Sequence, residues 1–207
     1  MQVLSRDQVN ALLEVAPDDT SRALYALAAT TGLRRGELLG LKWTDVNFEK
    51  AQLTVQRTAH RVKSRGVVMG EPKTAAGRRT VRLGAMAVSV LKRQRSLQLE
   101  QRLAAGPAWD EQGLLFANTM GMPLDAARVT RKFQDTLYRA GLPKIRFHDL
   151  RHTAATLLIE QGVTLKAVQA TMGHSTIATT MDVYAHVTPA MQDSVAEAMD
   201  RIFGESL

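Results

Sequence analysis

The chain has no cysteine among its 207 residues. Disulfide bonds, zinc sites built on thiolates and cysteine nucleophiles are therefore excluded, and a reducing compartment is compatible with the sequence. Long apolar runs are missing as well, because the longest one near the start spans only residues 23–29, whereas a membrane-spanning helix needs about 20 apolar residues. The first residues also lack the basic and then apolar regions of a signal peptide. We expect a cytoplasmic protein.

Acidic residues are the minority among the charged ones. Aspartate and glutamate number 20 against 27 lysines and arginines, which gives a formal net charge of +7. This surplus favours a polyanionic partner, although charge alone does not distinguish nucleic acid from an acidic membrane. Apolar residues make up 45% and charged residues 23% of the chain, which is the balance of a folded globular protein. The length predicts one sizeable domain, and we find no repeat, low-complexity tract or linker.

Helical spacing of apolar residues dominates the sequence. Ser5 and Gln8 form a capping-box pattern ahead of such residues, which predicts the start of a helix. A second helix should end at Gly32, because glycine adopts the left-handed conformation at a helix end without steric cost. Apolar residues alternate at 51–55 and 81–83, which predicts strands of a small sheet. Further helices are expected at 38–41, 88–103, 124–140, 148–161, 164–172, 176–187 and 190–203.

Basic residues concentrate between the two predicted strands. Residues 57–82 hold eight lysines and arginines and a single acid, Glu71. A solvated basic hairpin accounts for such a run, and so does a clamp on the DNA backbone. The candidates for DNA contact are Arg57, Arg61, Lys63, Arg65, Arg78 and Arg79.

Residues that can act on a phosphate lie mainly in the last third of the chain. His148 and Arg151 are three residues apart, so a helix would place an imidazole and a guanidinium on neighbouring positions of one face. His174 follows at a predicted helix start, and Tyr184 comes ten positions later. Each pattern is weak alone, because a surface helix can carry a histidine and an arginine at this spacing by chance.

Four features together are more specific than any one of them: the segments 31–38 (TGLRRGEL), 148–153 (HDLRHT) and 172–175 (MGHS), and Tyr184. Their order and spacing resemble those of the tyrosine recombinases of the phage integrase family. The resemblance implies an α+β, mainly α-helical catalytic domain with a small antiparallel β-sheet of about three strands.

The resemblance also implies a domain organisation. The catalytic domain would cover residues 1–207, with a core at 1–187 and a C-terminal helix at 188–207 that packs in cis or docks onto a neighbouring protomer. Members of the family usually carry a separate helical DNA-binding domain ahead of the catalytic one, whereas Ser5 already begins the catalytic part here. We therefore expect a fragment without the N-terminal core-binding domain.

The implied activity is cleavage and rejoining of DNA through a covalent 3′-phosphotyrosyl intermediate. A phosphodiester under attack concentrates negative charge on its non-bridging oxygens, where two guanidiniums can each donate paired hydrogen bonds. A phenol is mostly protonated at neutral pH, so a tyrosine nucleophile benefits from a nearby base. The implied residues are Arg34 and Arg151 on the phosphate, Glu37 as supporting acid, Lys73 as proton donor to the leaving 5′ oxygen, His148 as base, His174 as hydrogen-bond donor to the phosphate, and Tyr184 as nucleophile.

No cofactor and no metal are expected. The covalent intermediate stores the energy of the broken bond, so resealing needs no ATP, and the sequence has no G-x-x-x-x-G-K-[ST] phosphate-binding loop. The implied partner is double-stranded DNA, bound by a homo-oligomer that forms a tetrameric synapse, while the free chain can be a monomer. No membrane partner is expected.

Three other functions are compatible with parts of the sequence. A type IB topoisomerase uses the same chemistry but relaxes DNA without exchanging partners, and synapsis of two sites distinguishes the two. A catalytically silent DNA-binding module is disfavoured, because Arg34, Arg151 and Tyr184 are all present. A metal-dependent nuclease that uses His148 and His152 predicts sensitivity to EDTA.

The remaining aromatic residues have ordinary explanations. Tyr25 lies in an apolar helix and is expected in the core, whereas Tyr138 is expected to be a packing or surface residue. Trp43 is expected to pack beside the helix that follows the first arginine rather than to stack on a base. The sequence does not indicate which DNA site is recognised, nor whether the outcome is integration, excision, dimer resolution or transposition.

Overall fold

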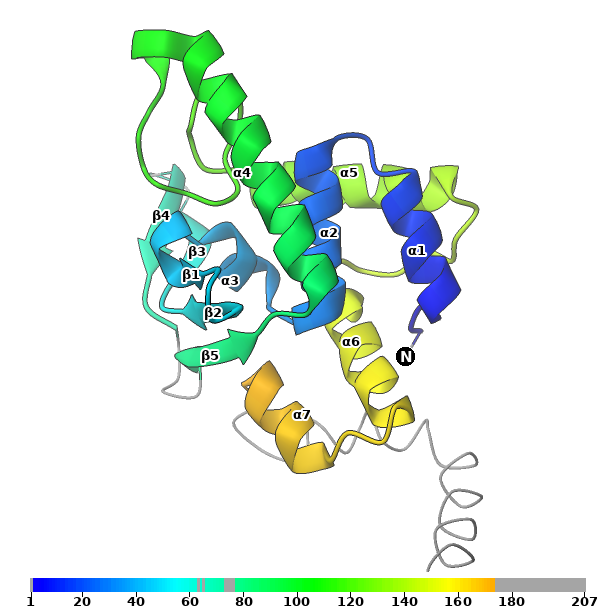
Figure 1. Cartoon of the computed structure of the whole chain (residues 1–207). Helices are drawn as coiled ribbons and strands as arrows, with labels where there is room; N and C mark the ends of the chain where they lie inside the picture. Colours follow the sequence, from blue (N-terminus) through cyan, green and yellow to red (C-terminus); the bar gives the residue numbers. More distant parts are fainter. Residues whose placement is uncertain (1, 63, 65, 73–76, 174–207) are drawn as a thin grey trace, which may run out of the picture.

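The computed structural model describes residues 2–62, 64, 66–72 and 77–173 (Figure 1). Helices make up most of this part of the chain, and the strands gather on one side of them. The helices are α1 (Arg6–Glu14), α2 (Asp19–Thr31), α3 (Arg35–Leu39), α4 (Ala85–Ala105), α5 (Ala126–Arg139), α6 (Asp149–Glu160) and α7 (Leu165–Met172), with 3-10 turns η1 (Trp43–Asp45) and η3 (Gly106–Ala108). The helices predicted at 176–187 and 190–203 lie outside the described residues.

The first two helices begin and end where the sequence predicts. The hydroxyl of Ser5 accepts from the backbone N–H of Gln8 at 3.3 Å, and the Gln8 side chain accepts from the backbone N–H of Ser5 at 2.9 Å. Gly32 ends α2 in the left-handed conformation, with φ at 63°. A Cβ at this position would lie 2.1 Å from Sδ of Met172. Gly32 is therefore required both by its backbone conformation and by the close approach of α7.

The β-structure consists of a three-stranded sheet and a separate hairpin. The sheet is antiparallel in the order β1 (Val46–Asn47), β2 (Gln52–Val55) and β5 (Arg79–Arg82), and the hairpin pairs β3 (Thr58–Val62) with β4 (Gly66–Gly70). Leu53 and Val81 face each other across β2 and β5, and both are buried, as their alternation predicts. The mainly helical α+β fold with a small antiparallel sheet is confirmed. The hairpin strands are additional, and β3 lacks a regular inside–outside alternation.

Helix α2 lies at the centre of the helical part and packs against α1, α4, α5 and α6 (Figure 1). Tyr25 of α2 is 1% exposed, and its ring meets Phe133 of α5 edge to face, with centroids 5.3 Å apart. Phe133 meets Phe147 in the same way, also at 5.3 Å. This aromatic cluster ties α2 and α5 to the residue directly before His148. The core position of Tyr25 is thus confirmed, whereas Tyr138 lies on the surface.

Helix α4 is longer than predicted and buries two glutamines one turn apart. The side-chain amides of Gln94 and Gln98 donate to the backbone carbonyls of Leu115 at 3.2 Å and Leu114 at 3.0 Å. The Gln98 side chain also accepts from the indole N–H of Trp43 at 2.5 Å. Trp43 therefore packs within the protein, with its hydrogen-bond partner on α4, and packing beside the helix after Arg34 stays a prediction.

Helices α6 and α7 pack together around a small apolar cluster of their own, which includes Ile159, Val168 and Met172. Gly173 ends α7 in the left-handed conformation, with φ at 66°. In the part of the chain that the structure describes, no helix combines the length and the apolar character needed to cross a bilayer.

Candidate active site

Arg34 lies at the start of α3, directly after the turn that ends α2. Its backbone N–H donates to Oε2 of Glu37 at 2.9 Å, which fixes the first turn of α3. Its guanidinium donates from Nη1 to Oε1 of Glu37 at 2.8 Å and from Nη2 to the carbonyl of Gly173 at 3.3 Å. The side chain is nevertheless 41% exposed. The guanidinium is thus held in place on one side and open to a ligand on the other.

Glu37 is a buried carboxylate shared by two arginines. Nη1 and Nη2 of Arg79 donate to its two oxygens at 3.2 and 2.9 Å, in addition to the hydrogen bonds from Arg34. Burial acts to raise the pKa of Glu37, but the hydrogen bonds and charge of Arg79 and the hydrogen bonds from Arg34 outweigh burial and hold this pKa below its usual value. Glu37 is therefore ionised at neutral pH and lies where a supporting acid for Arg34 is predicted.

Arg151 lies in the first turn of α6 and is 2% exposed. Its Nη1 donates to the carbonyl of Gly32 at 2.6 Å, whereas its Nη2 is buried with no hydrogen-bond partner among the described residues. Burial, followed by the positive charge of Arg34, lowers the pKa of Arg151 to about 9, so the guanidinium remains charged at neutral pH. A buried cation with a free donor is costly unless an anion accepts from it. Arg151 thus marks a position for an anion.

His148 directly precedes α6, and its carbonyl accepts from the backbone N–H of Arg151 at 3.0 Å. The two predicted residues therefore share one turn. His148 is exposed as a residue but its imidazole is partly covered, and its ring meets that of His152 edge to face at 5.2 Å. Partial burial, followed by the positive charges of His152 and Arg151, lowers the pKa of His148 from its usual 6.5. His148 is mostly neutral at pH 7 and can accept a proton.

Asp149 fixes the turn that carries His148, a role that was not predicted from the sequence. Its buried carboxylate accepts from the backbone N–H of Arg146 at 2.7 Å and from Nη2 of the same residue at 2.9 Å. Its carbonyl accepts from the hydroxyl of Thr153 at 3.0 Å, and that hydroxyl oxygen accepts from the backbone N–H of Leu4 at 3.1 Å. An acid at a helix start, three residues after an arginine, is the signal that could have identified it.

Two of the arginines predicted to contact DNA are exposed. Arg61 pairs with Asp125 at 3.0 Å, and Arg78 pairs with Glu71 at 2.6 Å. Exposed ion pairs contribute little to stability and leave both side chains free to change partners. DNA contact by Arg61 and Arg78 stays a prediction that this exposure permits.

Two other arginines of the same set are engaged within the protein. Arg57 donates to Asp45 at 2.5 Å and to the carbonyl of Gly40 at 3.4 Å. Arg79 is 8% exposed at its side chain and bound to Glu37. DNA contact by these two residues stays a prediction, whereas their contacts favour a role within the fold.

The other predicted site residues are Lys63, Arg65, Lys73, His174 and Tyr184, and all five lie outside the described residues. Their roles stay predictions. His148 and His152 lie side by side, yet within residues 2–173, apart from the gaps named above, no three histidines, aspartates or glutamates are grouped so that they could hold a metal ion.

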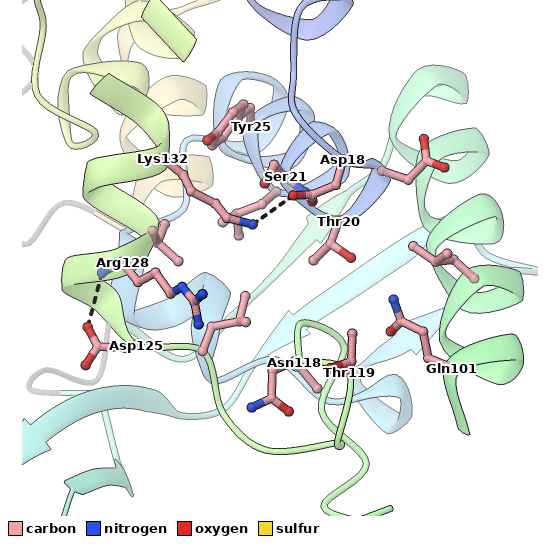
Figure 2. Close-up of a pocket in the computed structure, with 16 residues that line it drawn as sticks. Asp18, Thr20, Ser21, Tyr25, Gln101, Asn118, Thr119, Asp125, Arg128 and Lys132 are labelled. Carbon is pink, nitrogen blue, oxygen red and sulfur yellow. Dashed lines mark hydrogen bonds and ion pairs between the residues drawn. The ribbon is translucent and has the colours of Figure 1, made fainter. Parts of the chain in front are cut away.

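A cavity of about 530 Å³ lies elsewhere, between the start of α2, α4 and α5 (Figure 2). Lys132 of α5 and Asp18, which caps α2, form an ion pair at 2.8 Å on its wall. Tyr25 and Ser21 lie on the same wall. Of the described residues predicted to be catalytic, none lines this cavity. The candidate active site is therefore the cluster around Arg34 and Arg151.

Comparison with known proteins gives one consistent family. A model described as the phage integrase family matches residues 2–191. A tyrosine recombinase XerC-like protein of Caldanaerobacter subterraneus is 36% identical over 214 residues, which cover 98% of this chain and 55% of that protein. An integrase of Streptomyces ambofaciens is also 36% identical, over 98% of this chain and 53% of its own length. The chain thus spans about half the length of the curated relatives it matches.

Solved structures agree with the sequence matches. The crystal structure of XerA recombinase superposes with a TM-score of 0.74 at 26% identity, over 96% of this chain and 65% of that one. The Tn1549 transposon integrase in complex with transposon right end DNA gives a TM-score of 0.76 at 28% identity, over 97% of this chain and 65% of that one. From its sequence and its fold, the chain belongs to the phage integrase family of tyrosine recombinases.

Proposed function

We propose that this chain is the catalytic domain of a tyrosine-type site-specific recombinase that cleaves and rejoins DNA strands. The observation that carries the proposal is the buried Nη2 of Arg151, which has no partner among the described residues, beside the exposed guanidinium of Arg34. Two guanidiniums held in place suit a phosphodiester, because Arg34 is exposed on one side and a buried donor of Arg151 is unpaired among the described residues. Neither ATP nor a metal is needed, because the covalent intermediate retains the energy of the broken bond.

The proposed reaction is an exchange of phosphate esters. The phenol oxygen of Tyr184 attacks the scissile phosphorus, the bond from phosphorus to the 5′ oxygen breaks, and the 3′ phosphate remains attached to the tyrosine. The phenol proton passes to His148, whose lowered pKa keeps the imidazole neutral and able to accept it. The departing 5′ oxygen takes a proton from Lys73. Attack of a 5′ hydroxyl on the phosphotyrosine then reverses these steps and reseals the DNA.

The two arginines are proposed to stabilise the transition state. Negative charge develops on the non-bridging oxygens during the attack, and preorganised donors there lower the barrier because they need no rearrangement. Loss of one such donor costs about 3–4 kcal/mol in the activation barrier. Arg34, held by Glu37, and Arg151, held by the carbonyl of Gly32, have this preorganisation. His174 is proposed to add a further hydrogen bond.

Double-stranded DNA is the proposed substrate, bound by several copies of the chain. The Tn1549 integrase and XerH are each known in complex with DNA, the latter with a palindromic difH substrate. The exposed Arg61 and Arg78, together with Lys63 and Arg65, are proposed to contact the backbone. In the proposed tetrameric synapse, the segment 188–207 would couple neighbouring protomers.

Covalent trapping tests this function. When the protein cleaves a nicked duplex of randomised sequence, the short strand between the scissile phosphate and the nick dissociates. The cleaved DNA then cannot be resealed and stays attached to the protein. The wild-type chain should form an EDTA-resistant adduct, and the recovered DNA then provides a defined substrate. Tyr184→Phe should form none, whereas Tyr138→Phe, which alters an exposed phenol, should react normally. An adduct with Tyr184→Phe would refute the nucleophile, and loss of the reaction in EDTA would indicate a metal-dependent nuclease.

A further inference from the structure

Arg79 differs from the other arginines of the basic segment in how its guanidinium is used. It begins β5, and its side chain is 8% exposed. Nε donates to the carbonyl of Thr171 at 2.8 Å, Nη1 to Oε1 of Glu37 and to the carbonyl of Gly77, both at 3.2 Å, and Nη2 to Oε2 of Glu37 at 2.9 Å. A guanidinium has five N–H donors, so these four hydrogen bonds leave little capacity for a DNA phosphate.

The partners of Arg79 are the elements that hold Arg34. The two Nη groups of Arg34 donate to Glu37 and to the carbonyl of Gly173. Arg79 binds the same carboxylate, and through Thr171 it binds the last turn of α7, two residues before Gly173. Arg79 therefore anchors both acceptors that orient the Arg34 guanidinium, the Glu37 carboxylate directly and the Gly173 carbonyl through the last turn of α7.

The charges give Arg79 a second effect on the same site. A buried carboxylate with Arg34 as its sole cation would cancel the charge of Arg34. Arg79 supplies a buried counter-charge for Glu37 through two hydrogen bonds. The positive charge of Arg34 therefore remains available to an anion on its exposed side.

From these contacts we infer that Arg79 is a positioning residue for strand cleavage, which holds Glu37 and the end of α7 so that Arg34 points at the scissile phosphate. This inference rests on the proposed function. It assigns Arg79 no contact with DNA. Loss of the Arg79 side chain should therefore slow the chemical step and leave DNA affinity nearly unchanged.

The experiment compares Arg79→Ala, Arg79→Lys and the wild-type chain on a nicked duplex recovered by covalent trapping. Arg93→Ala is the control, because it removes an exposed arginine of α4 that pairs with Asp19. Misplacement of a catalytic group by about 1 Å can cost about 100-fold in rate, so Arg79→Ala should cleave about 100-fold more slowly in a single turnover. Its DNA affinity, measured by fluorescence anisotropy, should stay within about threefold of wild type. Arg93→Ala should cleave at the wild-type rate.

A methylphosphonate at the scissile position distinguishes positioning of Arg34 from a general loss of structure. Replacing one non-bridging oxygen by a methyl group removes one negative charge from the transition state, so the reaction depends less on a well-placed Arg34. On this substrate the cleavage rate of Arg79→Ala should be within about tenfold of the wild-type rate, whereas a partly unfolded protein is slow on both substrates.

Arg79→Lys covers the case in which Arg79→Ala does not fold, as judged by circular dichroism and thermal melting. A lysine retains the charge near Glu37 but cannot also bind Thr171 in the same geometry, so it should fold and cleave more slowly than wild type but faster than any folded Arg79→Ala. Equal rates for Arg79→Lys and wild type, or an equal defect on both substrates, would overturn the inference. If the wild-type chain itself traps no DNA, the proposed function fails and this inference fails with it.

Discussion

The turn between α2 and α3 offers a quantitative test of how the site is held together. Gly32 has φ at 63°, and a Cβ there would lie 2.1 Å from Sδ and 2.5 Å from Cε of Met172. The left-handed conformation costs a non-glycine residue about 1 kcal/mol. The overlap forces the buried Met172 to move, and overpacking of this kind costs about 1–3 kcal/mol. Gly32→Ala should therefore lower the free energy of unfolding by about 2–4 kcal/mol.

Gly162→Ala is the matched control. Gly162 follows α6 with φ at 75°, but no atom lies within 4 Å of the position a Cβ would take. This variant should lose about 1 kcal/mol, the cost of the conformation alone. The free energies are obtained from urea unfolding followed by circular dichroism at a fixed temperature. Equal losses for the two variants would refute the claim that contact with α7 requires glycine at position 32.

A double variant isolates the contact itself. Met172→Ala alone should cost about 2–5 kcal/mol, because it empties a fully buried position. In Gly32→Ala/Met172→Ala the new methyl group no longer meets sulfur, so the combined loss should be smaller than the sum of the single losses by about 1–2 kcal/mol. Strict additivity would show that the Gly32 penalty has another source.

Two predictions concern pH. The pKa of Glu37 in the folded protein lies below its usual 4.5. Its ionised form therefore contributes stability that is present above about pH 4.5 and is lost as the pH falls through the lower folded value. The free energy of unfolding, measured with urea from about pH 5 to pH 3, should decline less steeply in Glu37→Gln than in the wild-type chain, and equal slopes would contradict this. In the proposed reaction the neutral imidazole of His148 is the base, so single-turnover cleavage should fall as the pH drops through a pKa below 6.5. His148→Gln should cleave more slowly at neutral pH and lose this step, and an unchanged profile would assign the step to another group.

Features of the fold that depend on neighbouring residues could be predicted from the sequence. The capping box at Ser5 and the end of α2 at Gly32 follow from rules that span a few positions. The strand pair of Leu53 and Val81 follows from alternation along each strand. The short α3 (Arg35–Leu39) was predicted three residues too late, because its start is set by Glu37 accepting from the backbone of Arg34 rather than by apolar spacing.

Features that depend on distant partners could not be predicted in this way. Gln94 and Gln98 occupy the core side of α4 because they bind carbonyls 21 and 16 residues further along the chain, respectively, and a pattern of apolar residues does not reveal this because both side chains are polar. Arg79 looks like one of several arginines in a basic segment, yet it is buried because Glu37 lies opposite, 42 residues earlier. Its charge suggested a DNA contact, whereas its position indicates support within the protein.

The balance of charge around Glu37 gives a physical reason to expect effects on rate rather than on DNA binding. Among the described residues, Arg34, Arg79 and Arg151 influence one carboxylate, and the hydrogen-bonded pair of Arg79 and Glu37 is neutral. Two guanidiniums are left uncompensated. A phosphodiester carries one negative charge, whereas its five-coordinate transition state carries two, so in the proposed reaction we expect the site to match the transition state better than the bound substrate. Without the charge of Arg79 the site would have one surplus charge and match the substrate instead, and DNA would then bind without being cleaved efficiently.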